Sequence, residues 1–195
     1  MAESRPAVPV LLVVAVFSRH AAAADWAREQ LENVFGPVAL ASPAYDFTQT
    51  RYYEPTMGPG LRKQFLAFER LIAADSLAEI KRRTNALEQE LADAGLYIEP
   101  RPLNLDPGVL QLGKFLLATT KDQAHRVYLR DGIFAEVTLR FEAGAFEPWP
   151  WTYADYREPA VRDFLRRARD FYRGRLRENT AEPEASARDE PPCGP

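Results

Sequence analysis

The sequence predicts one α/β or α+β domain in which a mixed β-sheet of about five to seven strands is packed by three main helices. Three observations carry this prediction. The run Val10–Phe17 is short, continuous and rich in β-branched residues, as in a strand covered on both faces. Residues 76–93 repeat apolar side chains at helical spacing. Two strand-like runs, 126–130 and 133–141, flank Asp131-Gly132, and this dipeptide is the signature of a type I′ turn in a β-hairpin.

Two more helices are expected around this framework. Residues 22–35 have helical spacing and end at Gly36-Pro37, and residues 159–177 begin at a proline, which favours the first helical position. Asp75 is the expected N-cap of the helix at 76–93. Strand, helix and strand follow one another over residues 10–41, which suggests a β-α-β unit with the direction of strand pairing left open.

The segments between these elements are less regular. Residues 42–60 form an aromatic loop of the length that often carries function. Residues 61–72 fit a helix or a strand, and we favour the strand. Residues 97–106 are expected to form an edge strand because prolines cannot donate to a ladder, and 106–108 then form a turn. Residues 109–118 fit either a short helix or a strand.

Composition limits the class of protein. The globular domain is expected to span residues 1–178, and the polar, acidic, proline-rich residues 179–195 to be a disordered tail. A net charge of −3 and 46% apolar residues indicate a soluble protein without wholesale nucleic-acid or membrane binding. The single cysteine, Cys193, excludes an intrachain disulfide and fits the cytoplasm. Val8–Phe17 is too short to span a membrane and is interpreted as a buried strand rather than a signal peptide.

Different short motifs are spread along most of the chain. They are Tyr52-Tyr53-Glu54, Met57-Gly58, 68–72, Ile80-Lys81, 84–88, Asn104, Asp106-Pro107-Gly108, 117–122, His125-Arg126, Tyr128-Leu129, Gly132-Ile133, 135–139, 150–153 and Asp155-Tyr156. In combination they resemble the bacterial family called domain of unknown function 4416 (DUF4416), from about residue 10 to residue 173. The family has no established activity, so the resemblance implies no reaction. Arg19-His20 departs from the family pattern, which lowers His20 as a catalytic candidate.

The densest group of reactive side chains lies at residues 119–126. Lys121 and Arg126 can neutralise a phosphate or carboxylate, and the hydroxyls of Thr119 and Thr120 can add hydrogen bonds. A structural interpretation explains the same residues as a capped strand end and a solvated turn, and we keep both open.

His125 and Glu136 are the candidate catalytic residues. Counting outward from the Asp131-Gly132 turn places Val127 opposite Glu136, and His125 is then the diagonal neighbour of Glu136. His125 could move a proton while Glu136 holds its ring.

Polar motifs in other loops supply further candidate ligand-binding residues. They are Asn85, Lys81, Asn104, Asp106, Tyr53, Glu54 and Tyr153. Lys81, Asn85 and Glu88 line one side of the helix at 76–93, where a surface row is the favoured interpretation. The tyrosines of 52–53 and 153–156 can stack on a planar ligand, although the rim of a core is the commoner role.

Familiar catalytic and nucleotide-binding motifs are missing from the sequence. It contains no G-x-x-x-x-G-K-[ST] or G-x-G-x-x-G loop, no G-x-S-x-G elbow and no H-E-x-x-H helix. Two histidines are too few for a multi-histidine metal centre, and no cofactor is assigned.

Two functions from different classes are therefore expected. The first is binding of a small anionic ligand, with phosphoryl transfer or hydrolysis by His125 as an extension. The alternative is a non-enzymatic protein- or RNA-interaction module, built from the tryptophan-rich residues 146–156 and the arginine-rich helix at 159–177. Convergence of His125, Lys121, Asn85, Asp106 and Tyr153 on one pocket would favour the first. The sequence does not fix the oligomeric state.

Overall fold

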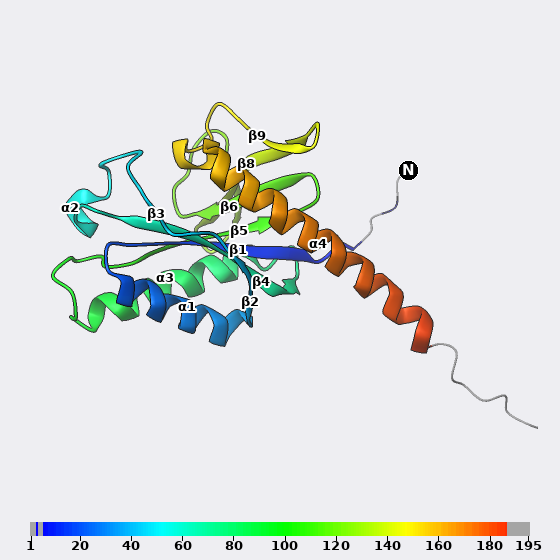
Figure 1. The fold of residues 1–195 in the computed structure, drawn as a ribbon, viewed down its shortest axis with the longest axis horizontal. Coiled ribbons are helices and arrows are strands. Elements are labelled where there is room, and N and C mark those ends of the chain that lie inside the picture. The colour runs from blue at the N-terminus through cyan, green and yellow to red at the C-terminus, as the bar shows by residue number, and fades with distance from the viewer. Residues whose placement is uncertain (1–2, 4–5, 187–195) are drawn as a thin grey trace, which may run out of the picture.

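The computed structural model describes residue 3 and residues 6–186, and it has an α+β fold (Figure 1). The strands are β1 (Val10–Ser18), β2 (Val38–Ala41), β3 (Tyr45–Asp46), β4 (Arg62–Ile72), β5 (Asn104–Leu110), β6 (Lys114–Thr119), β7 (Val127–Arg130), β8 (Ile133–Glu142) and β9 (Ala145–Pro148). The helices are α1 (Ala21–Phe35), α2 (Glu54–Met57), α3 (Leu77–Asp93) and α4 (Pro159–Ser186), with a 3-10 turn, η1 (Ala154–Arg157). The prediction of three main helices is confirmed.

The strands form one sheet in the order β2-β4-β1-β5-β6-β8-β7, with β3 beside β4 and β9 beside β8. Every strand pair in the described part of the chain is antiparallel, so the sheet is not mixed, and its nine strands exceed the predicted number. Because β4 lies between β1 and β2, the predicted β-α-β unit is a split one. The series β1-α1-β2-β4-α3-β5 interleaves two split units, the arrangement of ferredoxin-like folds.

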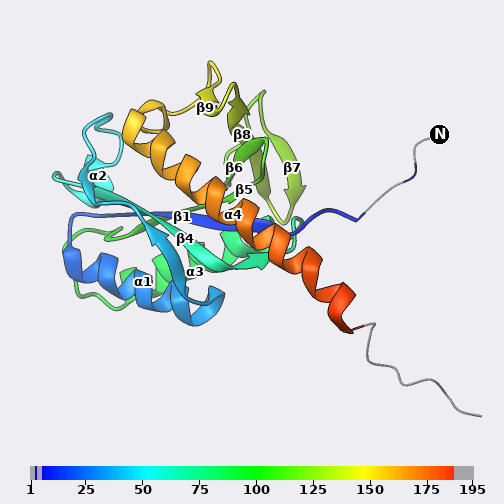
Figure 2. The same cartoon turned by 45° about the vertical axis from the view of Figure 1, so that its right-hand side comes forward.

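Strand β1 is the centre of the molecule, as predicted, and all its residues are buried. Its alternate side chains enter two different cores because successive residues of a strand point to opposite faces. Leu11, Val13, Ala15 and Phe17 pack in the core that includes α4, whereas Leu12, Val14 and Val16 pack with α1 and α3. Figure 1 and Figure 2 show α1 and α3 on one face of the sheet and α4 running diagonally across the other.

The prediction for residues 97–108 is wrong. These residues contain no edge strand; β5 begins at Asn104 and pairs with β1 and β6, and Asp106-Pro107-Gly108 lies inside it rather than in a turn. Pro107 is tolerated because pairing with β6 begins only at Gly108, so that the proline has a neighbouring strand on one side only. Gly108 allows close approach: a Cβ there would lie 2.4 Å from the carbonyl oxygen of Leu116.

The predicted hairpin is present. Asp131 and Gly132 both have positive φ, 54° and 74°, as a type I′ turn requires. Arg130 faces Ile133 as expected, but an irregularity between Tyr128 and Arg130 shifts the ladder, and Val127 faces Ala135 instead of Glu136. A bulge of this kind cannot be counted from turn chemistry alone.

Several element boundaries also differ from the predictions. The segment 61–72 contains β4, which begins at Arg62, so the favoured strand is confirmed, and 109–118 contain the end of β5 and most of β6. The N-cap of α3 is Ser76 rather than Asp75, and the Ser76 hydroxyl donates to the carbonyl of Ala73. Helix α4 continues to Ser186, past the predicted boundary at 178. Residues 187–195, including Cys193, lie outside the described residues. None of the described helices is long and apolar enough to cross a membrane.

Candidate functional site

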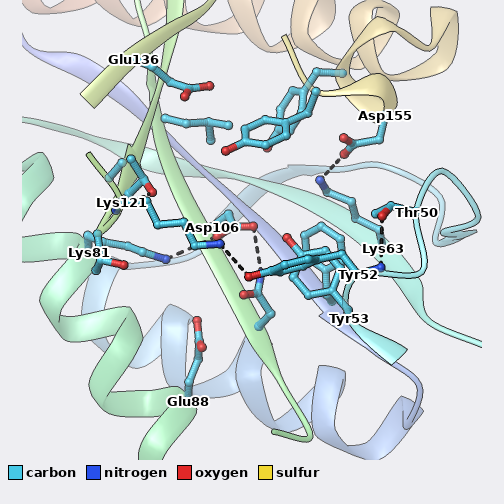
Figure 3. Close-up of a pocket in the computed structure, with 18 of the residues that line it drawn as sticks. Thr50, Tyr52, Tyr53, Lys63, Lys81, Glu88, Asp106, Lys121, Glu136 and Asp155 are labelled. Atoms are coloured by element: carbon cyan, nitrogen blue, oxygen red, sulfur yellow. Dashed lines mark hydrogen bonds and ion pairs between the residues drawn. The ribbon is translucent and has the colours of Figure 1, made fainter. Parts of the chain in front are cut away.

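A pocket of about 840 Å³ opens at the end of the sheet where β1 finishes and β4 and β5 begin (Figure 3). Its volume lies within the usual range for small-molecule sites. The sheet, α3 and the loops at 47–53, 119–126 and 151–156 supply its walls. The five residues chosen to separate the two functional hypotheses, His125, Lys121, Asn85, Asp106 and Tyr153, all line it.

The other predicted site residues that line the pocket are Glu136, Arg126, Thr119, Thr120, Lys81, Asn104 and Tyr53. Glu54 does not. It is the exposed first residue of α2 and forms an ion pair with Arg51 at 3.8 Å.

The pocket exists because the ladder between β5 and β6 stops early. Pairing ends at Gly108 and Leu117, so the first residues of β5 have no partner in β6. Side chains of α3 take the place of a strand at Leu105. Its N–H donates to Glu88 Oε1 at 2.7 Å, and its carbonyl accepts from Lys81 Nζ at 2.8 Å. The gap between the strands is thus lined by charged groups instead of backbone.

The row Lys81, Asn85 and Glu88 therefore faces the pocket and is not a solvated surface row. The side chains of Lys81 and Glu88 are only 6% and 11% exposed. Lys81 Nζ lies 3.3 Å from Asp106 Oδ1, and Asn104 donates to the other Asp106 oxygen at 2.8 Å. Burial opposes ionisation of Asp106, but Lys81 and Lys63 outweigh it and hold the pKa of Asp106 below its ordinary value.

Arg101 completes this network, and sequence reasoning missed it. Its guanidinium forms an ion pair with Glu88 at 2.8 Å and also hydrogen-bonds Asn104. Burial raises the pKa of Glu88 in spite of the nearby cations Lys81 and Arg101. Only proximity in the fold reveals Arg101, because it lies in an irregular segment with no motif of its own.

The expected contact between His125 and Glu136 is present, at 3.2 Å between His125 Nε2 and Glu136 Oε2. The contact forms despite the shifted register because His125 lies before β7 and is therefore outside the irregular ladder. The His125 ring also stacks on Trp151, with centroids 5.2 Å apart and planes at 17°. Two contacts on different sides thus fix the imidazole at the pocket wall.

Arg126 lines the pocket, but its charge is already paired within the protein. Its Nε lies 2.8 Å from Glu136 Oε2, and both side chains are almost fully buried. The remaining guanidinium nitrogens donate to the Lys121 carbonyl at 2.8 Å and to the Tyr153 hydroxyl at 2.7 Å. Arg126 is consequently neutralised by Glu136 and ties the 119–126 loop to Tyr153.

Lys121 is the pocket cation that lacks a compensating carboxylate. Lys63, Lys81, Arg101, Lys121 and Arg126 give five cations in the lining, against the four carboxylates Glu88, Asp106, Glu136 and Asp155. Among the described residues, Lys121 alone of these cations forms no ion pair. Its ammonium donates instead to the Tyr52 hydroxyl at 2.9 Å, and this hydrogen bond lowers the pKa of Tyr52. Figure 3 shows this contact at the pocket.

The inner end of the pocket contains Lys63 and Asp155, which form a buried ion pair. Neither residue was expected from the sequence. Lys63 lies within 4.1–4.9 Å of the ring centroids of Phe17, Tyr156 and Phe65. Burial lowers the pKa of Lys63, while Asp155 opposes this effect. A signal was available: Lys63 alternates with buried Phe65 and Ala67 on one face of β4, a pattern that places a cation in the core.

The arginine-rich face of α4 interacts mainly with the protein itself. Arg162 pairs with Glu147, Arg169 donates to the Leu112 carbonyl and stacks on Phe141, and Arg166 and Arg173 pair with Asp163 and Asp170. The pairs of Arg166 and Arg173 join residues three positions apart on the helix. In the described part of the chain, no group of three or more His, Cys, Asp or Glu residues is placed to hold a metal ion.

The comparison with protein families decides the relationship. A family model described as a domain of unknown function, DUF4416, matches residues 8–172. The chain belongs to this family. The match covers the sheet and the first half of α4, and therefore all the residues of the pocket in this DUF4416 protein. Neither the curated proteins nor the solved structures give a significant match.

Proposed function

We propose that this DUF4416 protein binds a small anionic ligand, bearing a phosphate or a carboxylate, in the pocket at the end of the sheet. One observation carries the proposal: His125, Lys121, Asn85, Asp106 and Tyr153, from widely separated parts of the chain, converge on a single pocket. A pocket with several convergent polar groups is the best candidate for a binding site in a protein of this kind.

Lys121 is the group that meets the anion. Its charge is uncompensated by any carboxylate of the described residues, and the neighbouring hydroxyls of Thr119 and Thr120 border the same pocket. An exposed ammonium with hydroxyl neighbours suits a phosphate or carboxylate, which accepts charge-assisted hydrogen bonds. Arg126 then acts indirectly, because its contacts with the Lys121 carbonyl and Tyr153 fix the loop.

His125 extends the proposal to catalysis. Its ring is held by Glu136 and Trp151, the arrangement that a proton-transferring histidine needs. Phosphoryl transfer and hydrolysis are the reaction classes that use such a group beside a bound anion. The proposal includes a cytoplasmic location, supported by a sequence with one cysteine.

Ligand-induced stabilisation of the full-length protein tests the binding proposal. We expect inorganic phosphate or a phosphorylated small molecule to raise the melting temperature, since a ligand at 100 times its Kd adds about 2.7 kcal/mol to the free energy of unfolding. Lys121→Gln should abolish the shift without lowering the melting temperature of the free protein. Lys114→Gln is the matched control, because Lys114 begins β6, the strand that leads into the Lys121 loop, and lies outside the pocket. Equal shifts in both variants would refute the role of Lys121.

The interaction-module alternative receives less support. It combined the tryptophan-rich residues 146–156 with the arginine-rich helix, and on α4 Arg162, Arg166, Arg169 and Arg173 all contact groups of the protein.

A further inference from the structure

An aromatic wall lies between Lys121 and Lys63, two lysines that line the pocket. Lys121 contacts the Tyr52 hydroxyl, and the Tyr52 ring lies 5.2 Å from that of Tyr53. Tyr53 in turn lies 5.8 Å from Phe17, whose ring centroid is 4.1 Å from Lys63 Nζ. All five side chains line the pocket. A ligand lying along this wall would meet rings on its side and a cation at each end.

The inner end offers hydrogen-bond donors that the protein does not use. The Tyr156 hydroxyl is buried and has no hydrogen-bond partner in the described part of the chain, although the residue lines the pocket. Lys63 has three N–H donors, and Asp155 is the one acceptor that it meets among the described residues. Buried donors of this kind are costly unless a partner satisfies them.

We propose that Lys63 and Tyr156 form an inner subsite that donates hydrogen bonds to a carbonyl or carboxylate oxygen of the ligand. The inference deepens the proposed function and rests on it. It defines the ligand class as a planar molecule with an acceptor oxygen at one end and an anionic group at the other. The planar body lies against Tyr53 and Phe17, because aromatic side chains stack on flat rings. Mononucleotides whose bases carry carbonyl oxygens belong to this class.

Tyr156→Phe is the sharpest variant because it removes only the unpaired hydroxyl. If Tyr156 had only a structural role, Tyr156→Phe would change neither ligand affinity nor stability, since deleting an unsatisfied buried polar atom does not lower stability. Tyr45→Phe is the matched control: the Tyr45 hydroxyl is also buried without a partner, but Tyr45 does not line the pocket.

Calorimetric titration of the full-length protein with uridine 5′-monophosphate and with inorganic phosphate tests the inference. We expect the nucleotide to bind at least about tenfold more tightly than phosphate, because ring stacking and a hydrogen bond add to the contacts of the anion. Tyr156→Phe should weaken nucleotide binding by about 3- to 10-fold and leave phosphate binding and the melting temperature unchanged. Tyr45→Phe should change neither affinity.

The outcomes separate the inference from the proposed function. If phosphate binds and depends on Lys121, but the nucleotide binds no more tightly, the inner subsite is refuted and the proposed function stands. Tighter nucleotide binding that Tyr156→Phe does not weaken also refutes the subsite. If neither phosphate nor the nucleotide binds, both proposals fall.

Discussion

Lys63 and Asp155 pair in surroundings where a single charge is poorly tolerated. Their side chains are 2% and 6% exposed, and aromatic rings surround the ammonium. Removal of one partner leaves the other charged and buried. We therefore expect Asp155→Ala to lower the free energy of unfolding by about 3–5 kcal/mol, measured by urea denaturation. Glu142→Ala breaks the exposed Arg140–Glu142 pair and serves as the control, with an expected loss of about 0–1 kcal/mol. Similar losses would contradict the burial argument.

Asp106 makes the stability of the folded protein depend on pH in the acidic range. Its pKa is held below the ordinary aspartate value of about 3.9, so the folded protein binds the proton less readily than the unfolded chain. The resulting stability is fully present above that ordinary value and is lost as the pH falls through the lowered one. We expect the stability difference between wild type and Asp106→Asn to be constant near neutrality and to shrink below about pH 4. A difference that does not change with pH would show that Asp106 ionises equally in both states.

The residues of the 119–126 segment were predictable as a group, whereas their partners were not. Local sequence exposes a run such as Thr119 to Arg126, and His125 met Glu136 as expected. The inner pair escaped notice because Lys63 and Asp155 are separated by 92 positions and neither belongs to a reactive cluster in sequence. The role of Arg126 at the ligand stays a prediction, and its buried partner Glu136, which neutralises its charge, could not be foreseen from local sequence.

Strands β5 and β6 pack tightly at Gly108. A Cβ at this position would lie 2.4 Å from the Leu116 carbonyl oxygen and 2.6 Å from Phe115 Cζ. We expect Gly108→Ala to force the strands apart and to cost roughly 1–3 kcal/mol in a denaturation experiment. Gly113→Ala, in the connection between the same strands, has nothing within 4 Å of the added Cβ and should be tolerated. Equal effects would indicate a backbone cause unrelated to packing.

Elements whose pattern is local were predicted well. The apolar run of β1, the 3.6-residue period of α3 and the Asp131-Gly132 turn each depend on neighbouring residues. Strand β5 was missed because Pro107-Gly108 is a turn signal in isolation. In the fold, the end of the β6 ladder accommodates the proline and close packing requires the glycine. Tertiary context overrides local preference there.

At the scale of the whole molecule, β1 joins the two larger cores. Because its alternate residues enter opposite cores, neither core can open without disturbing the same strand. We expect one cooperative unfolding transition. Leu165→Ala on the α4 side and Leu87→Ala on the α3 side should each lower the free energy of unfolding by about 2–5 kcal/mol. Coincident transitions by circular dichroism and tryptophan fluorescence check this expectation, and two separate transitions in either variant would contradict it.

The early end of the β5–β6 ladder lets charged side chains of α3 reach between the strands to groups of β5. A continuous sheet keeps the chemistry of its two faces apart. Here Lys81 and Glu88 reach from α3 to the backbone of Leu105. Lys81 also contacts Asp106, which pairs with Ala15 of β1, and Ala15 packs in the core on the α4 side. Substitutions on α3 can therefore change the charge of the pocket while the hydrogen bonds between strands stay in place. Divergence of ligand preference within this fold needs no change in its sheet.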